Sequence, residues 1–323
     1  MPPALRPDDL EVVRAFAAAL AGKDPKTIAV YVGTIRDLIA WVRMRPGGTP
    51  FRITLLTETI IQDYLQHLEA RQRAPRTRSK VLRAIRRFCR WAVEDGRLRR
   101  NPALAIERPT VAALAPTELT ADQRSVLKTL VERHQSPRLA AIFALGYWAG
   151  LRISEVAALR RDQCVLNARA GTITVLGAKG GKTRTIDLHN VARRALSGYL
   201  QLPATAFDTR EPESDYVFTS QRAAWLRQRG RPDHLSARGI AHLWADLKRH
   251  ATHDEWELIK DITFHDLRHD WAHRARAAGW SLEEIAVYAG HQTKAGAPAI
   301  TTTARSTLPS RQQLKARLQL LRG

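Results

Sequence analysis

The sequence has very little cysteine and no long hydrophobic run. Only Cys89 and Cys164 occur among 323 residues, which excludes a disulfide framework and favours a reducing interior. No apolar run approaches the roughly 18–20 residues that cross a bilayer. Residues 1–11 also lack the apolar stretch of a signal peptide. We therefore expect a protein of the cytoplasm that makes no membrane contact.

Acidic residues are scarce relative to basic ones. The chain has 52 Lys and Arg against 31 Asp and Glu, so its formal net charge is +21. Charges of one sign repel each other and destabilise the compact chain, and binding to a polyanionic partner offsets this repulsion. The hydrophobic content of 44% and the charged content of 26% are ordinary for a folded globule, which excludes a disordered basic tail as the main body.

The length predicts about two domains, at roughly 150 residues each. Residues 101–119 contain three prolines and no long periodic stretch, as is typical of a linker. We predict a mainly α fold with a small antiparallel β element (α+β). It has a helical domain over residues 1–106, a linker over 107–118 and a mixed α/β domain over 119–323.

Local signals place the secondary structure within these domains. Apolar spacing predicts four helices in the first domain, near residues 10–20, from Asp24-Pro25, from Thr57 and over 76–94. In the second domain, helices are predicted from Thr120, over 136–150, from Ser236, near Phe264 and from Ser281. Residues 172–176 and 183–188 are predicted to pair as strands, and residues 202–234 to be irregular.

The helix over 76–94 is strongly basic. Nine Lys or Arg and no acid lie between positions 71 and 90. Apolar residues occupy one helical face and cations another, which suits a helix lying along DNA phosphates. An ordinary solvated basic face is the alternative. The predicted DNA-binding residues are Arg76, Arg78, Lys80, Arg83, Arg87 and Arg90.

Two motif-like segments mimic other functions. Residues 177–183 resemble a phosphate-binding P-loop, but one residue of the spacing is missing and the segment leads into a strand. His265 and His269 mimic a zinc helix, but Arg268 beside them would repel a dication. We therefore predict neither a nucleotide cofactor nor a metal.

A different grouping of basic residues favours phosphodiester chemistry. Arg152 precedes a short helix, Lys179 lies in the turn between the two strands, and His265 and Arg268 share a helix face. His291 follows Gly290 at the end of another predicted helix. Guanidinium groups supply paired donors to non-bridging oxygens, an amine supplies a proton, and imidazoles transfer protons or donate to phosphate.

These residues lie in four segments that resemble the tyrosine recombinases of the phage integrase family. The segments are AGLRISEVAAL (149–159), GAKGGKTR (177–184), FHDLRHDWA (264–272) and YAGH (288–291). The resemblance covers nearly the whole chain and implies a SAM-like helical core-binding domain before a catalytic domain. It also implies strand cleavage and rejoining through a 3′-phosphotyrosyl link, without any cofactor.

The resemblance implies a role for each matching residue. Arg152 and Arg268 would clamp the scissile phosphate, and Lys179 would protonate the departing 5′ oxygen. His265 would assist proton movement at the nucleophile, and His291 would hydrogen-bond the phosphate. Glu155 would orient these groups, with a plain surface acid as the alternative.

The chain departs from the family at the nucleophile. All six tyrosines precede His291, and Ser306 stands where the family has its tyrosine. An aliphatic hydroxyl is harder to ionise and shorter than a phenol, so we predict DNA binding without cleavage. The alternatives are a natural non-catalytic DNA-binding regulator and a metal-dependent nuclease, and whether Ser306 is natural or introduced stays open.

The end of the chain predicts self-association. Residues 310–322 form an amphipathic helix by their spacing, which could dock on its own domain or on a neighbour. The resemblance implies dimers or tetramers on duplex DNA with an inverted-repeat site. It also implies a mobile genetic element and association with the bacterial nucleoid.

Overall fold

The computed structural model describes residues 5–110, 118–176, 183–201, 214–291 and 297–307. The chain divides into two compact units, 1–113 and 114–323, which we describe separately. The domain boundaries at 106 and 119 stay a prediction. Within the described residues, no helix is long and apolar enough to cross a membrane.

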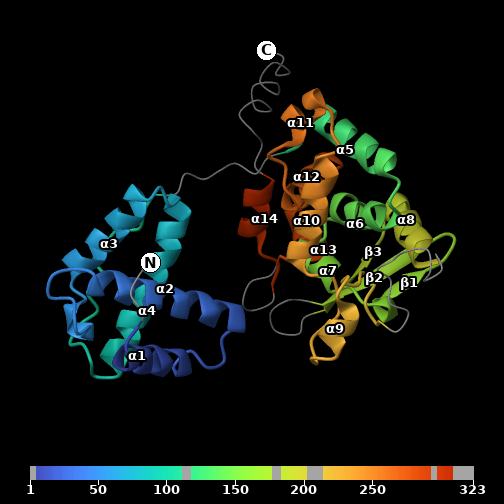
Figure 1. Ribbon diagram of the computed structural model, residues 1–323. Coiled ribbons are helices and arrows are strands. Elements are labelled where there is room, and N and C mark those ends of the chain that lie inside the picture. Colours follow the sequence, from blue (N-terminus) through green and yellow to red (C-terminus); the bar gives the residue numbers. More distant parts are fainter. Residues whose placement is uncertain (1–4, 111–117, 177–182, 202–213, 292–296, 308–323) are drawn as a thin grey trace, which may run out of the picture. The chain divides into compact units, whose positions relative to one another are not determined.

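The first unit is a group of helices (Figure 1), and aromatic side chains pack in its core. Asp24 and Thr57 accept hydrogen bonds from backbone amides of the first turns of their helices, as expected of N-cap residues. The Phe16, Phe88 and Trp91 rings meet at centroid distances of 5.1–5.6 Å. The four predicted helices are confirmed as α1 (Pro7–Ala18), α2 (Pro25–Arg43), α3 (Glu58–Ala70) and α4 (Pro75–Glu94), with a 3-10 turn at Ile53–Leu55.

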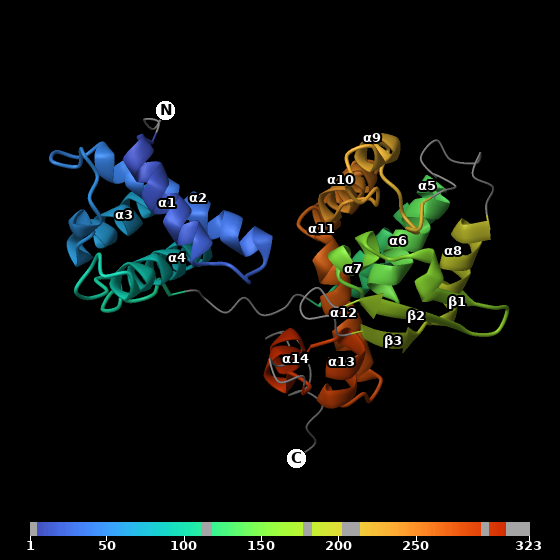
Figure 2. The same cartoon turned by 90° about the horizontal axis from the view of Figure 1, so that it is seen from below.

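The second unit combines helices with one small sheet (Figure 2). Its first part contains α5 (Ala121–His134), α6 (Pro137–Tyr147), α7 (Ile153–Ala157), a 3-10 turn (Arg161–Gln163), β1 (Cys164–Leu166), β2 (Gly171–Leu176) and β3 (Thr183–Asp187). Its second part contains α8 (Asn190–Gln201), α9 (Ala223–Arg227), α10 (Ala237–Lys248), α11 (His253–Ile259), α12 (Phe264–Ala277), α13 (Leu282–Ala289) and α14 (Ile300–Ser306). The predicted mainly α fold with a small antiparallel sheet is confirmed.

The sheet is antiparallel throughout, in the order β1-β2-β3. Ile173 of β2 lies opposite Ile186 of β3 and opposite Cys164 of β1. The predicted hairpin is confirmed to within one residue at each end. Strand β1 was not predicted, because three residues are too few to show an alternating pattern.

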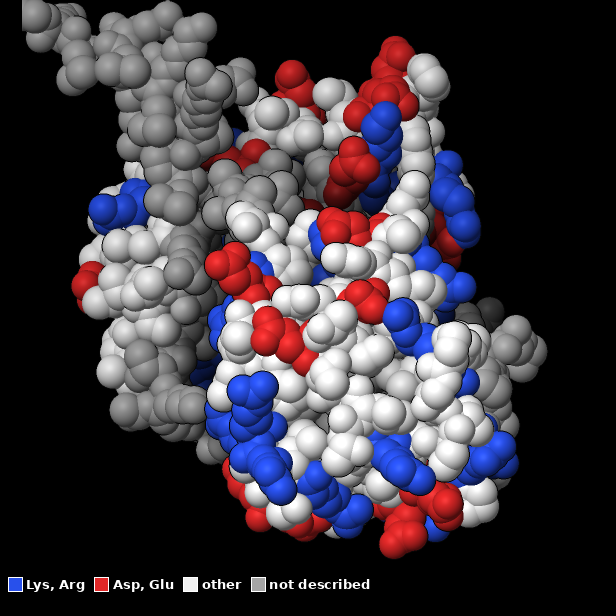
Figure 3. All heavy atoms as spheres, turned by 90° about the vertical axis from the view of Figure 1, so that its left-hand side faces the viewer, with Lys and Arg blue, Asp and Glu red and all other residues white. Residues whose placement is uncertain are grey.

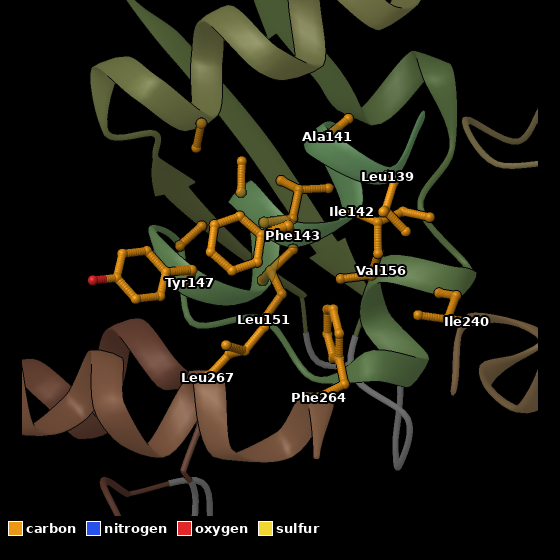
Figure 4. Close-up of a cluster of buried hydrophobic side chains, with 14 of the residues drawn as sticks. Leu139, Ala141, Ile142, Phe143, Tyr147, Leu151, Val156, Ile240, Phe264 and Leu267 are labelled. Carbon is orange, nitrogen blue, oxygen red and sulfur yellow. The ribbon is translucent and has the colours of Figure 1, made fainter. Parts of the chain in front are cut away.

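Helix α6 lies at the centre of the second core. Nearly all its residues from Leu139 to Tyr147 are buried, and Figure 4 shows Phe264 and Leu267 reaching from α12 into the cluster around Phe143. The predicted end of this helix at residue 150 is wrong, because Gly150 has a φ of +60° that a right-handed helix excludes. A Cβ on Gly150 would lie 2.5 Å from the Trp271 ring, so the turn also brings the backbone close to α12.

Candidate active site

The first guanidinium of the site stands at the start of α7. Arg152 is the N-cap residue, and its backbone N–H donates to Oε2 of Glu155 at 2.9 Å. Its Nη1 donates to Oε1 of the same carboxylate at 2.8 Å. The capping box fixes where the arginine side chain begins, and 35% of that side chain remains exposed. Glu155 therefore fixes the side chain of Arg152, and the exposed part of that side chain is accessible to a ligand.

The second guanidinium belongs to Arg268 on α12 and is buried. Its Nη1 donates to the carbonyl of Gly150, and its Nη2 donates to the carbonyl of Ala289, each at 2.5 Å. The same Nη2 lies 3.0 Å from Nε2 of His291. Arg268 therefore connects the turn before α7 to the end of α13 and to the imidazole that follows it.

The end of α13 brings these groups together. Nη1 of Arg152 also donates to the Ala289 carbonyl, at 3.3 Å, and its Nη2 donates to the Gly290 carbonyl at 3.3 Å. Gly290 caps the helix in the left-handed conformation with a φ of +66°, which favours glycine. Three of the predicted residues, Arg152, Arg268 and His291, thus meet at one helix terminus.

Glu155 is a buried acid. Its side chain is only 4% exposed, and Nη1 and Nη2 of Arg184 donate to its two oxygens at 3.0 Å each. Burial alone raises the pKa of Glu155, but the hydrogen bonds and charges of Arg184 and Arg152 outweigh it and lower the pKa to about 2. The carboxylate therefore stays ionised and holds two arginines in place.

Arg184 was not among the predicted site residues, although it ends one of the family-like segments. Its Nε donates to the Tyr288 carbonyl at 2.8 Å, so it connects β3 to α13. A Cβ at Gly290 would lie 2.6 Å from its Nη1. The available signal was its place as the second residue of the second strand, directly after the glycine-rich turn.

The two imidazoles of the site are neutral near pH 7. Burial and the charges of Arg268 and Arg152 lower the pKa of His291 to about 3. Burial and the charge of Arg268 lower the pKa of His265 as well. His265 lies one turn before Arg268 on α12 and keeps part of its surface exposed. The charges of Arg268 and Arg152 act on it, so it belongs to the same electrostatic neighbourhood.

The structure describes only part of the remaining residues that the proposed chemistry involves. Lys179 lies outside the described residues, between the ends of β2 and β3. Ser306 is the last residue of α14, and its side chain is also outside them. Tyr288, a conceivable substitute nucleophile, stacks on Trp271 at 4.8 Å and donates from its hydroxyl to the Asp187 carbonyl. Burial raises the pKa of Tyr288 to about 12, which disfavours that role.

Two basic residues of helix α4 pair with acids that lie outside residues 71–90. Arg78 pairs with Glu69 at 2.7 Å, and Arg87 pairs with Glu94 at 3.3 Å. Both acids lie just outside residues 71–90 in sequence. Glu69 belongs to α3 and Glu94 to the last turn of α4, and the fold places them beside Arg78 and Arg87. Four of the six predicted DNA-binding residues have exposed side chains, namely Arg76, Lys80, Arg83 and Arg90.

The face drawn in Figure 3 carries both basic and acidic side chains. On the face drawn in Figure 3, Lys and Arg side chains lie in several groups with Asp and Glu side chains between them. Within the residues that the structure covers, no three His, Cys, Asp or Glu side chains gather as metal ligands do.

Comparisons with known proteins match both units. The phage integrase family matches residues 118–300, and the phage integrase N-terminal SAM-like domain matches residues 11–96. Tyrosine recombinase XerC of Pelobacter propionicus is 30% identical over 288 residues, which cover 87% of each chain. Tyrosine recombinase XerA of Thermococcus kodakarensis is 28% identical over 284 residues, 87% of this chain and 86% of that one.

Solved structures share the fold. A lambda integrase dimer bound to a COC′ core site has a TM-score of 0.65 at 16% identity, over 92% of this chain and 94% of that one. The Tn1549 transposon integrase in complex with a circular intermediate DNA has a TM-score of 0.66 at 15% identity, over 96% and 99%. The chain thus has the fold of the lambda and Tn1549 integrases. The chain belongs to the phage integrase family, whose relatives named above are tyrosine recombinases.

Proposed function

We propose that this chain is a site-specific recombinase that binds duplex DNA with an inverted-repeat site, and that Arg152, Arg268 and His291 receive the scissile phosphate. One observation carries this proposal: both guanidinium groups donate to the Ala289 carbonyl, and an imidazole lies 3.0 Å from one of them. Forked N–H donors match the non-bridging oxygens of a phosphate. Glu155 alone cannot neutralise the cluster, so a net positive charge remains for an anion.

In the tyrosine-bearing form, the nucleophilic oxygen attacks phosphorus while the bond from phosphorus to the 5′ oxygen breaks. His265 takes the proton from the nucleophile, and Lys179 gives a proton to the departing oxygen. The 3′-phosphotyrosyl link keeps the bond energy until a 5′ hydroxyl of a partner strand attacks it. The two arginines and His291 stabilise the charge that develops on the phosphate, and such fixed donors usually contribute most to the rate.

We propose further that Ser306 leaves this chain unable to cleave. A phenol ionises near pH 10, whereas an aliphatic hydroxyl approaches the ~15.7 of water. The difference corresponds to about 8 kcal/mol of extra deprotonation cost. Serine is also shorter than tyrosine, and misplacement of a reacting atom can cost ~100-fold. The chain would bind and pair DNA sites without breaking a strand.

The test is adduct formation with a nicked duplex that carries an inverted repeat from the DNA flanking the coding region. We expect no covalent adduct with the unaltered chain, an adduct with Ser306→Tyr, and none with Ser306→Phe, which restores the ring but not the hydroxyl. An adduct with the unaltered chain would overturn the cleavage defect. Duplex binding without any adduct from Ser306→Tyr would favour the non-catalytic regulator.

Helix α4 is proposed to lie along phosphates through Arg76, Lys80, Arg83 and Arg90. Counterion release makes the logarithm of the binding constant fall with the logarithm of the salt concentration, by about one unit of slope per contact. We expect Arg83→Ala to reduce that slope by about 1. The matched control Arg87→Ala, whose guanidinium is already paired with an acid, should change the slope less. Equal slopes for Arg83→Ala and the unaltered chain would remove α4 from the interface.

Self-association on DNA is proposed by analogy with structures that share the fold. Lambda integrase forms a dimer on a core site and a tetramer on a Holliday junction. The predicted helix over 310–322 lies outside the described residues, and we propose that it links protomers. A chain that stops after Thr307 should then sediment on DNA with fewer protomers. Unchanged stoichiometry would assign the tail to its own domain.

A further inference from the structure

Thr303 is a buried polar residue that nothing in the resemblance assigned. It lies on α14 with 0% of its surface exposed, one helical turn before position 306. Its Oγ1 is 3.0 Å from Nδ1 of His291 and donates to the carbonyl of Ala299 at 3.2 Å. The N–H of Ala299 in turn donates to the carbonyl of His291 at 2.6 Å. The start of α14 is therefore attached to both the backbone and the ring of His291.

The hydroxyl of Thr303 determines which nitrogen of His291 carries the proton. A threonine hydroxyl has one proton, and Thr303 gives it to the Ala299 carbonyl. Towards His291 the hydroxyl oxygen can only accept. Nδ1 of His291 must therefore carry the hydrogen of the 3.0 Å contact.

The other side of the ring requires the same tautomer. Nε2 of His291 faces Nη2 of Arg268 at 3.0 Å, and a guanidinium has only donors. Nε2 must then be the acceptor and carry no proton. Two contacts from different helices, one from α12 and one from α14, thus agree on a ring that is protonated at Nδ1 alone.

The charges around the ring keep it in this neutral form. Arg268 of α12, Arg152 before α7 and Arg184 of β3 all disfavour a second proton on His291, as does His269 of α12. Glu155 of α7 is the acid of this neighbourhood, and hydrogen bonds from two of the arginines engage it. Burial adds to these effects and holds the pKa of His291 at about 3.

We propose that Thr303 is a positioning residue that locks His291 in the Nδ1–H tautomer and thereby fixes helix α14, which carries position 306, against the Arg268–His291 pair. The inference rests on the proposed function for its catalytic meaning. Its structural content, the tautomer and its dependence on Thr303, stands independently of any DNA chemistry. Without the hydroxyl, the ring would lose its Nδ1 acceptor and α14 would lose one of its attachments next to position 306.

The tautomer can be read directly from the side-chain nitrogens of the full chain. In a ¹⁵N-labelled sample near pH 7, with His291 assigned by the signals that His291→Asn loses, we expect a protonated Nδ1 and a bare Nε2. Thr303→Val should abolish that pattern, and Thr303→Ser, which keeps the hydroxyl, should restore it. Thr301→Val is the matched control, since Thr301 is exposed on the same helix, and it should leave the pattern unchanged. A protonated Nε2 in the unaltered chain, or an unchanged pattern in Thr303→Val, would overturn the inference.

The catalytic consequence is tested in the Ser306→Tyr background. Thr303→Val should slow covalent adduct formation by about 100-fold, the scale expected for a misplaced nucleophile, with duplex binding unchanged. Thr303→Ser should recover most of the rate, and Thr301→Val should match the parent. If Ser306→Tyr forms no adduct while the Nδ1–H pattern depends on Thr303, the proposed function fails and the tautomer lock stands. If the adduct forms equally fast in Thr303→Val, the positioning role is refuted.

Discussion

Replacement of Glu155 by glutamine would remove one charge from the site and keep the shape of the side chain. The carboxylate accepts from the backbone and Nη1 of Arg152 and from both terminal nitrogens of Arg184, and it lies 3.8 Å from Nη1 of Arg268. An amide offers one acceptor oxygen in place of two. The variant therefore leaves three guanidinium groups close together without their shared anion.

The size of the effect follows from the pKa of Glu155. Burial works against the charged form, but the arginines lower the pKa from 4.5 to about 2. At about 1.4 kcal/mol per pKa unit, this corresponds to about 3 kcal/mol of folding free energy at neutral pH. That figure agrees with the roughly 3–5 kcal/mol that follows from removing one partner of a buried ion pair. Little discount for solvent is due, because the side chain is 4% exposed.

The pH dependence has a definite sign. A lowered carboxyl pKa stabilises the folded state above the unfolded pKa, and the contribution disappears as the pH falls towards the folded pKa. In urea unfolding, Glu155→Gln should be less stable by about 3 kcal/mol at pH 7 and by about 2 kcal/mol at pH 3.5. Glu283→Gln, at an exposed position of α13, should change stability by less than about 0.5 kcal/mol. The reasoning is refuted if Glu155→Gln matches the parent at pH 7, or if the deficit does not shrink in acid.

Two further predictions concern the end of α13. Gly290→Ala should lower the unfolding free energy by about 2 kcal/mol, because the Cβ would lie 2.6 Å from Nη1 of Arg184 in a backbone with positive φ. Gly279→Ala, also at positive φ but with open space around it, isolates the backbone cost in thermal unfolding, and an equal loss in both variants would exclude the steric contribution. Tyr288→Phe removes a hydrogen bond to a β3 carbonyl and should cost about 1 kcal/mol. In the Ser306→Tyr background, this variant should leave adduct formation intact, and its loss would make Tyr288 part of the chemistry.

Local sequence was sufficient for most of the secondary structure. The N-caps at Asp24, Thr57, Thr120 and Ser281 all accept amide hydrogen bonds as their spacing predicted. Each of these signals lies within four residues of the helix start, so it survives without tertiary information. Strand β1 was not predicted, because its three residues have no local pattern and form a strand only by pairing with β2.

The site was predictable in its residue types but not in its connections. Arg152, Arg268 and His291 could be named from family-like segments, yet the contact between Arg184 and Glu155 spans 29 positions and leaves no local pattern. The same limit applies to α4, because the acids that pair with Arg78 and Arg87 lie outside the basic segment of residues 71–90. Pairing across elements depends on tertiary packing, which neither periodicity nor a charge count reports.

The way the guanidinium groups are held explains how the site keeps its charge. A carboxylate orients an arginine but also neutralises it, whereas a peptide carbonyl orients it with a dipole alone. Arg268 is held by the carbonyls of Gly150 and Ala289, and Arg152 by those of Ala289 and Gly290, with Glu155 the one acid shared among the described groups. The carbonyl end of α13 also carries partial negative charge that favours cations. Because backbone carbonyls share the orienting with a single carboxylate, the cluster keeps the positive charge that a phosphate anion requires.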